Sequence, residues 1–199
     1  NLTEENIYVL DSPILSNSQL KKFKKFFSKK TKEIDCTFDI SSSLKDRIEK
    51  IREEAETSVR EGSTCLILSD KNISNKKASI PSILTVGAVH SHLVKLGLRG
   101  YCSLNVECAD ALDTHSFAIL IGVGATTVNP YLAIDSIYQR YEKNLFGKSD
   151  FESCVVKFKK SIDAGLLKIM SKMGISVISS YRGGCNFEAV GLSRAIVSD

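Results

Sequence analysis

Apolar residues along the chain fall into segments of helical spacing that alternate with short, continuous apolar runs. Apolar positions three or four residues apart predict helices, whereas runs of about four to eight apolar residues predict buried strands. Helices are expected at about 17–30, 43–61, 81–96, 115–121, 131–145 and 155–173, with a further short one from Cys185. Strands are expected at 34–38, 64–68, 101–106, 126–128 and 175–178.

This order of elements predicts an α/β fold with a mostly parallel sheet of alternating strand–helix units. The connections between parallel strands should be right-handed. A doubly wound sheet and an incomplete β/α barrel both fit, because five units do not close an eight-stranded barrel. Gly165 lies in the middle of the 155–173 helix. Since a glycine there costs the helix about 1 kcal/mol relative to alanine, we expect close packing against a neighbour.

The composition supports a folded core and limits the classes of protein. Of the 199 residues, 43% are hydrophobic and 25% are charged, which argues against intrinsic disorder. The longest apolar stretch, Phe117–Ala125, is far shorter than the roughly 20 residues of a membrane helix, so no membrane partner is expected. The chain begins at Asn1 without a secretory signal, which predicts a processed chain or a segment of a longer protein.

The cysteines give no metal or redox motif. None of the six forms a C-x-x-C pair, which argues against zinc ribbons and thioredoxin-type sites. Cys36, Cys65 and Cys102 lie in apolar, β-like runs, where a free thiol behaves as a small hydrophobe. Without a secretory signal we expect a reducing compartment, which is the cytoplasm, or the plastid stroma if the gene is plastid-encoded.

The net charge of +4 comes from one segment. Lys21–Lys32 contains seven lysines and no acid, which leaves 20 basic and 23 acidic residues elsewhere. Leu20, Phe23, Phe26 and Phe27 form an apolar stripe in the same segment, so we interpret the lysines as the solvated face of a helix. A nucleic-acid-binding or membrane-binding surface is the alternative.

Several motifs that invite a ligand-binding interpretation fail on spacing. Gly122–Gly124 lacks the third glycine of a dinucleotide fingerprint and follows a helix, so a helix C-cap is the better interpretation. His90 and His92 are two residues apart on a helix and therefore point in different directions. His115 permits an acid–base set or a polar loop with a helix cap, and its acidic neighbours in sequence are Glu107, Asp110 and Asp113.

In α/β folds, functional side chains gather where strands end and the following loops begin. The polar residues expected at these ends are Asp39, Asp70, Glu107, Asn129, Tyr181 and Arg182. Arg182 precedes Gly183-Gly184, and a guanidinium beside such a backbone could hold a carboxylate or phosphate. A salt bridge that fixes the loop is the more conservative interpretation.

Longer strings of the sequence resemble the large subunit of glutamate synthase. They are LDSPILSN at Leu10–Asn17, LILSD at Leu66–Asp70, IPSILTVGAVHSHLVKLGLR at Ile80–Arg99 and NPYLA at Asn129–Ala133. The most distinctive is GLLKIMSKMGISVISSYRGGCNFEAVGL at Gly165–Leu192. The strings follow the order of the family from near one end of the chain to the other, and they belong to the later part of its central domain.

The resemblance implies a multidomain flavoprotein that makes glutamate from 2-oxoglutarate and glutamine-derived ammonia. A glutaminase domain releases the ammonia, and an FMN-binding barrel uses it with electrons from NADPH or ferredoxin, partly through an iron–sulfur cluster. The central domain is then expected to be related to the flavin barrel but without its flavin. Residues 1–199 would form one domain that ends near the start of the FMN barrel, scaffolds the glutaminase and FMN domains, and lines the ammonia path. A small NADPH-oxidising subunit is a further partner implied for some members.

The chain departs from the family's motifs at two places. Cys102 and Cys108 have the first spacing of the cluster pattern C-x5-C-x4-C, but Asp113 stands at the third position, and the family's cluster lies downstream. Many members read Gly-Ala-Gln-Ile-Phe-Glu where this chain reads Gly183-Gly184-Cys185-Asn186-Phe187-Glu188. Cys185 therefore stands at the position of the family's glutamine, and no role of that amide is carried over. We therefore expect no catalytic, cofactor-binding or metal-binding residue in this chain.

Five residues are expected at a domain interface or along the channel, namely Asp70, Glu107, Asn129, Tyr181 and Arg182. Two other functions remain as alternatives. The first is a stand-alone α/β-barrel enzyme that uses Glu107, His115 and Arg182. The second, less favoured, is a basic nucleic-acid-binding module that works through Lys21–Lys32.

Overall fold

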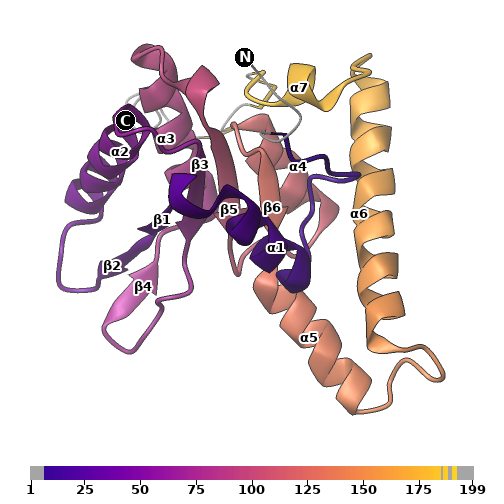
Figure 1. The fold of residues 1–199 in the computed structure, drawn as a ribbon. Coiled ribbons are helices and arrows are strands. Elements are labelled where there is room, and N and C mark those ends of the chain that lie inside the picture. Colours follow the sequence, from indigo (N-terminus) through magenta and orange to yellow (C-terminus); the bar gives the residue numbers. More distant parts are fainter. Residues whose placement is uncertain (1–6, 185, 188–189, 192–199) are drawn as a thin grey trace.

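The computed structural model describes residues 7–184, 186–187 and 190–191, with the strands in the middle of the molecule and helices around them (Figure 1). The helices are α1 (Asn17–Phe27), α2 (Leu44–Arg60), α3 (Ser82–Lys95), α4 (Thr114–Gly122), α5 (Tyr131–Glu142), α6 (Phe151–Lys172) and α7 (Ile178–Tyr181), with 3-10 turns η2 (Ser28–Lys30) and η3 (Arg99–Tyr101). The strands are β1 (Thr31–Asp35), β2 (Thr37–Asp39), β3 (Cys65–Ser69), β4 (Lys77–Ser79), β5 (Ser103–Glu107) and β6 (Thr127–Asn129).

Four strands form the main sheet, and their spatial order β1-β3-β5-β6 follows the sequence. Every neighbouring pair is parallel, so the predicted mostly parallel α/β fold is confirmed. Consecutive parallel strands, each followed by a helix, are the arrangement of a β/α barrel, whereas a doubly wound sheet reverses its order at a switch point. The strand order therefore selects the incomplete barrel. β2 and β4 form a separate antiparallel pair.

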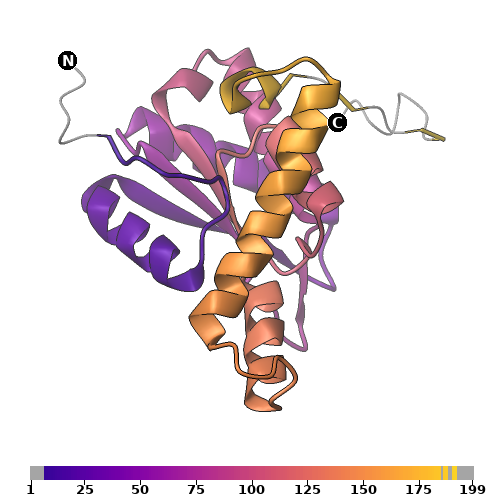
Figure 2. The same ribbon diagram turned by 90° about the vertical axis from the view of Figure 1, so that its right-hand side faces the viewer.

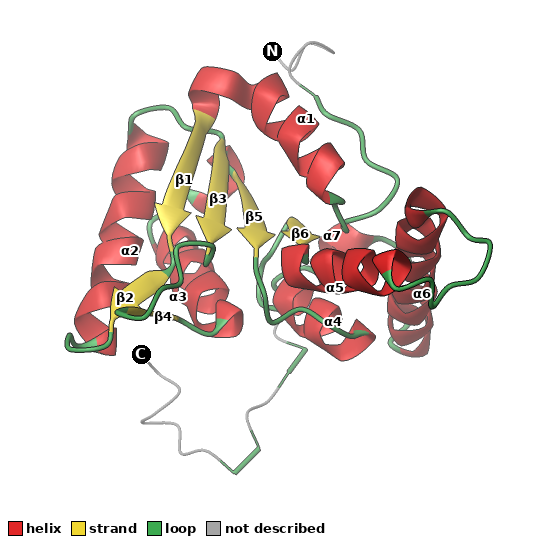
Figure 3. Cartoon of the chain, turned by 90° about the horizontal axis from the view of Figure 1, so that it is seen from below, coloured by secondary structure: helices red, strands yellow, loops and turns green. Residues whose placement is uncertain are grey.

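Different helices cover the two faces of the main sheet. Successive side chains of a strand point to opposite faces, so neighbouring residues of β3 show which helices lie on each side. Leu66 and Leu68 of β3 belong to a large core cluster that includes residues of α2, α3, α4 and α6. Cys65 and Ile67 of the same strand pack instead with apolar side chains of α1. Figure 3 shows α1 crossing one side of the sheet, with α3 and α4 on the other. The face under α1 corresponds to the inside of a barrel.

α1 is an amphipathic helix with a well-defined start. The Ser16 hydroxyl accepts from the Gln19 amide and the Gln19 side chain accepts from the Ser16 amide, which is a capping box. Leu20 and Phe23 are buried against the sheet. Most lysines of this segment are exposed, at positions 21, 22, 25, 29, 30 and 32, so they form the expected solvated face. The helix ends at Phe27 rather than near Lys30, and η2 follows it.

A short segment before α1 extends the main sheet at its β6 edge. Ile14 forms a parallel bridge with Val128; the Leu15 amide donates to the Val128 carbonyl at 2.9 Å, and the Val128 amide donates to the Pro13 carbonyl at 2.8 Å. The strand predicted at 175–178 is wrong, because Ile178 starts α7. A fifth strand would have to pair with the edge of β6, and Pro13–Leu15 already pairs there.

The strand predicted at 34–38 is divided between two sheets. The Asp35 carboxylate accepts from the Thr37 amide at 2.9 Å and from its hydroxyl at 2.7 Å, which turns the chain after β1. β2 then pairs with β4, which lies between the strand predicted at 64–68 and the helix predicted at 81–96, where no strand is expected from the sequence. The helix predicted from Cys185 falls mostly outside the described residues.

α6 runs across the molecule (Figure 2) and packs closely on α4. A Cβ at Gly165 would lie 2.4 Å from Cγ2 of Thr114, which is shorter than any normal contact between carbon atoms. The predicted reason for a glycine in the middle of this helix is confirmed.

Candidate functional site

The last residues of the parallel strands form a polar row along the carboxyl edge of the main sheet. Ser69, Glu107 and Asn129 end β3, β5 and β6 and are in register with one another. Residues in register on parallel strands point to the same face, which here is the face under α1. Asp70 follows Ser69 directly. The structure thus brings three of the five predicted site residues to one edge, and their role at an interface or channel stays a prediction.

Glu107 is the centre of this edge. Its side chain is 4% exposed, and Nζ of Lys71 lies 2.6 Å from its Oε1. Nζ of Lys24 lies 3.4 Å from Oε2, to which the Ser69 hydroxyl donates at 2.9 Å. Burial by itself raises the pKa of Glu107, but Lys71, Lys24 and Ser69 together hold it below the usual value. Glu107 is therefore an ionised carboxylate that joins α1 and the β3–β4 loop to β5.

Asp70 lies beside Glu107 but is held by neutral donors. It is 2% exposed, and its Oδ2 accepts from the Ala109 amide at 3.0 Å and from the Ser79 hydroxyl at 3.3 Å. Burial raises the pKa of Asp70, and the charge of Asp110 adds to this effect. Its Oδ1 is buried and has no hydrogen-bond partner among the described residues. Asp70 is thus a buried carboxylate whose surroundings raise its pKa and whose hydrogen bonds connect the β3–β4 loop to Ala109 and Ser79.

Asn129 connects the edge to the N-terminal segment. It is 1% exposed, and its Nδ2 donates to the Leu15 carbonyl at 2.8 Å and to Oδ1 of Asn17 at 3.0 Å. The Lys71 ammonium lies 5.0 Å from the ring centroid of Tyr131, in the helix that follows, where a cation–π attraction operates. The edge therefore fixes α1 and the following loops.

Tyr181 and Arg182 lie at the opposite end of the sheet, so their predicted place at the carboxyl edge is wrong. The buried Tyr181 hydroxyl donates to the Ala118 carbonyl of α4 at 3.0 Å, and the Gly183 amide donates to the Gly122 carbonyl at 2.9 Å. Gly122 ends α4 shortly before β6 begins. Figure 1 shows α7 at the top of the molecule and the β2–β4 pair at the bottom. The prediction depended on a strand at 175–178 that does not form.

Arg99 holds the amino ends of two strands together. Its guanidinium donates to the carbonyls of Cys102 at 2.7 Å and Gly124 at 2.8 Å, and to Nδ1 of His90 at 3.1 Å. Cys102 precedes β5 and Gly124 lies shortly before β6. The sequence offered no signal for this role, because a lone arginine after a helix belongs to no motif.

His90 completes this arrangement as a neutral ring. Burial lowers its pKa, and the charges of Arg99 and Arg182 lower it further. Gly124 and Gly183 have φ of +128° and +69°, and a Cβ on either would come within 2.3 and 2.8 Å of this ring, so both positions need glycine. His92 bonds instead to Oε2 of Glu56 at 2.8 Å, as expected for histidines that point in different directions.

The acidic residues near His115 serve as helix caps. Asp113 accepts from the Ser116 amide at 2.8 Å and Asp110 from the Ser82 amide at 3.0 Å, while His115 is exposed. The capped-loop interpretation is therefore confirmed. Glu107 and Arg182 lie at opposite ends of the sheet, so the enzyme set of Glu107, His115 and Arg182 is not assembled.

The described cysteines are buried core residues, all of them free. Burial raises the pKa of the Cys36 thiol to about 12, which makes it unreactive. Cys185 lies outside the described residues. Within the part of the chain that the structure describes, no group of three His, Cys, Asp or Glu side chains is placed to hold a metal ion. Across the same residues, no helix combines the length and apolar character needed to cross a bilayer.

The strand order and the filled inner face define an α/β domain of the incomplete β/α-barrel type, and solved flavin-barrel enzymes share its fold. A flavocytochrome b2 variant with benzoylformate aligns with a TM-score of 0.55 at 13% identity, over 91% of this chain and 42% of that one. DHODH from Eimeria tenella in complex with ferulenol aligns with a TM-score of 0.52 at 14% identity, over 79% and 38%. At these identities the likeness concerns the fold alone.

The sequence places the chain within a family. Residues 1–193 match the model of the glutamate synthase central domain, and the chain belongs to that family. It is 50% identical over 200 residues to the NADPH glutamate synthase large chain of Azospirillum brasilense. It is 42% identical over 192 residues to that of Bacillus subtilis and 39% over 204 residues to the ferredoxin-dependent glutamate synthase of Pyropia yezoensis.

These relatives are much longer than the chain. The alignments cover 94–99% of the chain but only 12–13% of each relative. The shared family is therefore a property of this one region.

Proposed function

We propose that the chain is the central domain of a glutamate synthase large subunit, where it scaffolds the glutaminase and FMN-binding domains and lines the ammonia path between them. The observation that carries this proposal is the family match over residues 1–193, together with 50% identity to a glutamate synthase large chain. The parent enzyme is then an oxidoreductase that makes glutamate from glutamine-derived ammonia and 2-oxoglutarate.

The chemistry of the carboxyl edge supports a scaffold. Glu107 is ion-paired with Lys71 and Lys24, and Asp70 is buried among hydrogen-bond donors, so both are engaged in holding the fold. A general acid or base needs a free path to a substrate. The alternative of a stand-alone barrel enzyme lacks an assembled set of catalytic side chains among the described residues.

The same edge does not fit a flavin. Leu20 and Phe23 of α1 pack over the inner face of the sheet, which is where an open barrel would have room for a flavin. We therefore assign FMN and the iron–sulfur cluster to other regions of the parent enzyme, with NADPH or ferredoxin as the electron source and a small NADPH-oxidising subunit as a partner in the first case. The cytoplasm or a plastid stroma is the proposed location.

Purification of the full-length parent protein tests this function. We expect it to form glutamate from glutamine and 2-oxoglutarate with NADPH or reduced ferredoxin, and the chain 1–199 alone to bind no flavin. Stoichiometric flavin absorbance in the chain 1–199, or a full-length protein that forms no glutamate, would contradict the proposal.

Arg182 provides a sharper test of the scaffold. Its charge reaches His90 and Arg99, which hold the amino ends of β5 and β6. If its loop supports a domain interface, Arg182→Ala in the full-length enzyme should leave glutamine hydrolysis running while glutamate formation falls, so that the two rates no longer match. If the rates of glutamine hydrolysis and glutamate formation still match in the variant, Arg182 plays no part in coupling the two sites. Lys95→Ala, on an exposed position of α3, serves as the control.

A further inference from the structure

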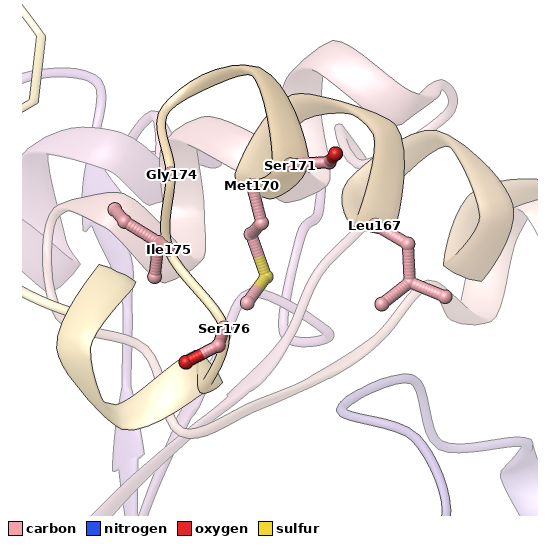
Figure 4. A pocket seen from close by; sticks show the side chains of 6 residues that line it. All are labelled: Leu167, Met170, Ser171, Gly174, Ile175 and Ser176. Carbon is pink, nitrogen blue, oxygen red and sulfur yellow. The ribbon is translucent and has the colours of Figure 1, made fainter.

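Two features of the surface are not explained by the fold of the domain. The first is a shallow hollow of about 450 Å³ at the turn from α6 into α7, lined in part by Leu167, Met170 and Ile175 (Figure 4). The described residues do not show what covers this hollow. The second is a row of lysines on the solvent side of α1, the helix that crosses the sheet in Figure 3. For this second feature the chain itself contains an acidic segment close by.

The lysine face of α1 consists of Lys21, Lys22 and Lys25, all of them exposed. Lys25 follows the other two by four and three residues, so the three side chains are neighbours on the helix surface. Across the residues that the structure describes, none of the three forms an ion pair, whereas Lys24 of the same helix pairs with two carboxylates. Like charges at this spacing repel and destabilise a helix. The lysine face therefore lacks a counter-charge.

The segment that precedes α1 contacts the same helix through Tyr8. The Tyr8 ring packs edge-on against the rings of Phe23 and Phe26, with centroids 5.4 and 5.0 Å away. Phe26 is 42% exposed and lies one helical turn after Lys22, so the two side chains are neighbours on the helix surface. Tyr8 is thus fixed at the border of the lysine face, and the residues before it start beside these lysines.

Two acidic residues stand shortly before Tyr8 in the sequence. Glu4 and Glu5 belong to residues 1–6, which lie outside the described residues, but covalent geometry limits their distance from Tyr8. An extended chain spans at most about 3.6 Å per residue, so the Cα atoms of Glu5 and Glu4 can be no more than about 11 and 14 Å from that of Tyr8. Such a short tether keeps both carboxylates at an effective concentration on the order of millimolar beside the lysine face.

We propose that Glu4 and Glu5 dock on the lysine face of α1 and form ion pairs with Lys22 and Lys25. The segment that leads into α1 is then held at both of its ends, since Pro13–Leu15 pairs with β6. The contact fixes the course of the polypeptide that enters the domain, which goes beyond the proposed function and does not depend on it. Exposed ion pairs of this kind position a segment but add little to the free energy of unfolding.

Proteolysis of the full-length protein with a protease that cleaves after glutamate tests the docking. Cleavage after Glu4 and Glu5 requires the segment to leave the lysine face, so its rate follows the population of the undocked form. Lys22→Gln/Lys25→Gln should therefore raise the rate of cleavage at these two bonds about threefold. Mass spectrometry of the fragments measures the rate at these bonds separately from cleavage elsewhere.

Lys168→Gln/Lys172→Gln is the matched control, because it removes two exposed lysines from α6 and changes the net charge equally. Its rate of cleavage at the same bonds should equal that of the wild type, and far-UV circular dichroism checks that both variants keep the fold. An unchanged rate in Lys22→Gln/Lys25→Gln, or an equal rise in both variants, would overturn the proposal.

Zero-length cross-linking of the same protein with a carbodiimide identifies what occupies the lysine face. We expect peptides that join the segment 1–6 to Lys22 or Lys25. The Glu33–Lys24 pair, whose carboxylate and ammonium lie 2.9 Å apart, is the internal reference for the yield. Links from the lysine face to a carboxylate elsewhere in the polypeptide, or to a second copy of it, in place of the segment 1–6 would show a different occupant and refute the docking.

Discussion

The two ends of the main sheet fix their loops by different means. At the carboxyl edge, the negative charge of Glu107 is balanced by the side chains of Lys71 and Lys24. At the amino end, the positive charge of Arg99 is held by the backbone carbonyls of Cys102 and Gly124 and by neutral His90. One end therefore depends on titrating and screened charges, and the other on backbone geometry.

This difference predicts different sensitivities. Ion pairs between side chains weaken with salt and with protonation of the acid. A guanidinium stays charged at any ordinary pH, and bonds from it to backbone carbonyls respond to neither condition. The stability contributed by the amino end should therefore be insensitive to salt and pH but fall strongly on substitution. The stability contributed by the carboxyl edge should depend on salt and pH and fall less on substitution.

Arg99→Ala should have the largest effect on stability. It removes four hydrogen bonds from a charged donor, the fourth of them to the Thr126 hydroxyl, and leaves the carbonyls of Cys102 and Gly124 without that partner. We expect a loss of about 3 kcal/mol in the free energy of unfolding, measured by urea unfolding of the chain 1–199. The loss should be the same at low and high salt.

Arg99→Lys is the matched control for this prediction. It keeps the charge but replaces the planar fork of donors by a single ammonium, so it should recover only part of the lost stability. Full recovery would mean that charge alone matters at the amino end, and the proposed contrast between the two ends would fail.

Glu107→Gln should have a smaller effect that depends on pH. Lys24 and Lys71 are 25% and 47% exposed and can turn to water, so we expect a loss of about 1–2 kcal/mol at neutral pH. The pKa of Glu107 is lowered in the folded protein, and its value in an unfolded chain is about 4.3. The stabilisation is therefore complete above the unfolded value and is lost as the pH falls through the folded one.

Urea unfolding of the wild type and of Glu107→Gln between neutral pH and pH 3 measures this effect. The difference between the two proteins should shrink on acidification, and a constant difference would show that the charge of Glu107 is not what matters. Glu33→Gln is the control, because Glu33 also pairs with Lys24, at 2.9 Å, but is 55% exposed. Its loss should be much smaller than that of Glu107→Gln.

The sequence predicted the carboxyl edge better than the amino end, for a physical reason. Parallel strands end at a common edge, so Asp70, Glu107 and Asn129 could be placed together from strand ends alone. Their partners Lys24 and Lys71 could not be predicted, because contacts of a helix or a loop with the end of another strand leave no mark on local spacing. The ion pair with Lys24 depends on the position of α1, and the ion pair with Lys71 depends on the path of the β3–β4 loop.

The amino end could not be predicted because two cues pointed elsewhere. Ile175–Ile178 has the apolar character of a strand, and a strand there would place Tyr181 and Arg182 at the carboxyl edge. Pro13–Leu15 already pairs with β6, so this strand does not form and both residues lie at the amino end. The spacing of His90 and His92 shows only that the two side chains point in different directions. The bond from Arg99 to His90 depends on how α3 packs beside the start of β5. Competition for a sheet edge is a tertiary property that periodicity does not contain.

Lys24→Met should have the smallest effect of the three and separates the anchoring lysine from its neighbours. Its ammonium lies 2.9 Å from Oε1 of Glu33 and 3.4 Å from Oε2 of Glu107, whereas Lys22 on the same helix is exposed. Methionine keeps the aliphatic stem, so only the ion pairs are lost, and Lys71 still balances Glu107. We expect a loss of about 0.5 kcal/mol at low salt.

Lys22→Met is the matched control, with no measurable change expected, and urea unfolding at low salt and in 1 M salt is the measurement. Salt should erase the difference between the two variants, because ion pairs near the surface are screened. Equal losses from both substitutions would mean that the lysine-rich segment acts through its total charge. Glu107 would then be compensated by a diffuse field, and the carboxyl edge would no longer differ from the amino end in depending on specific side-chain pairs.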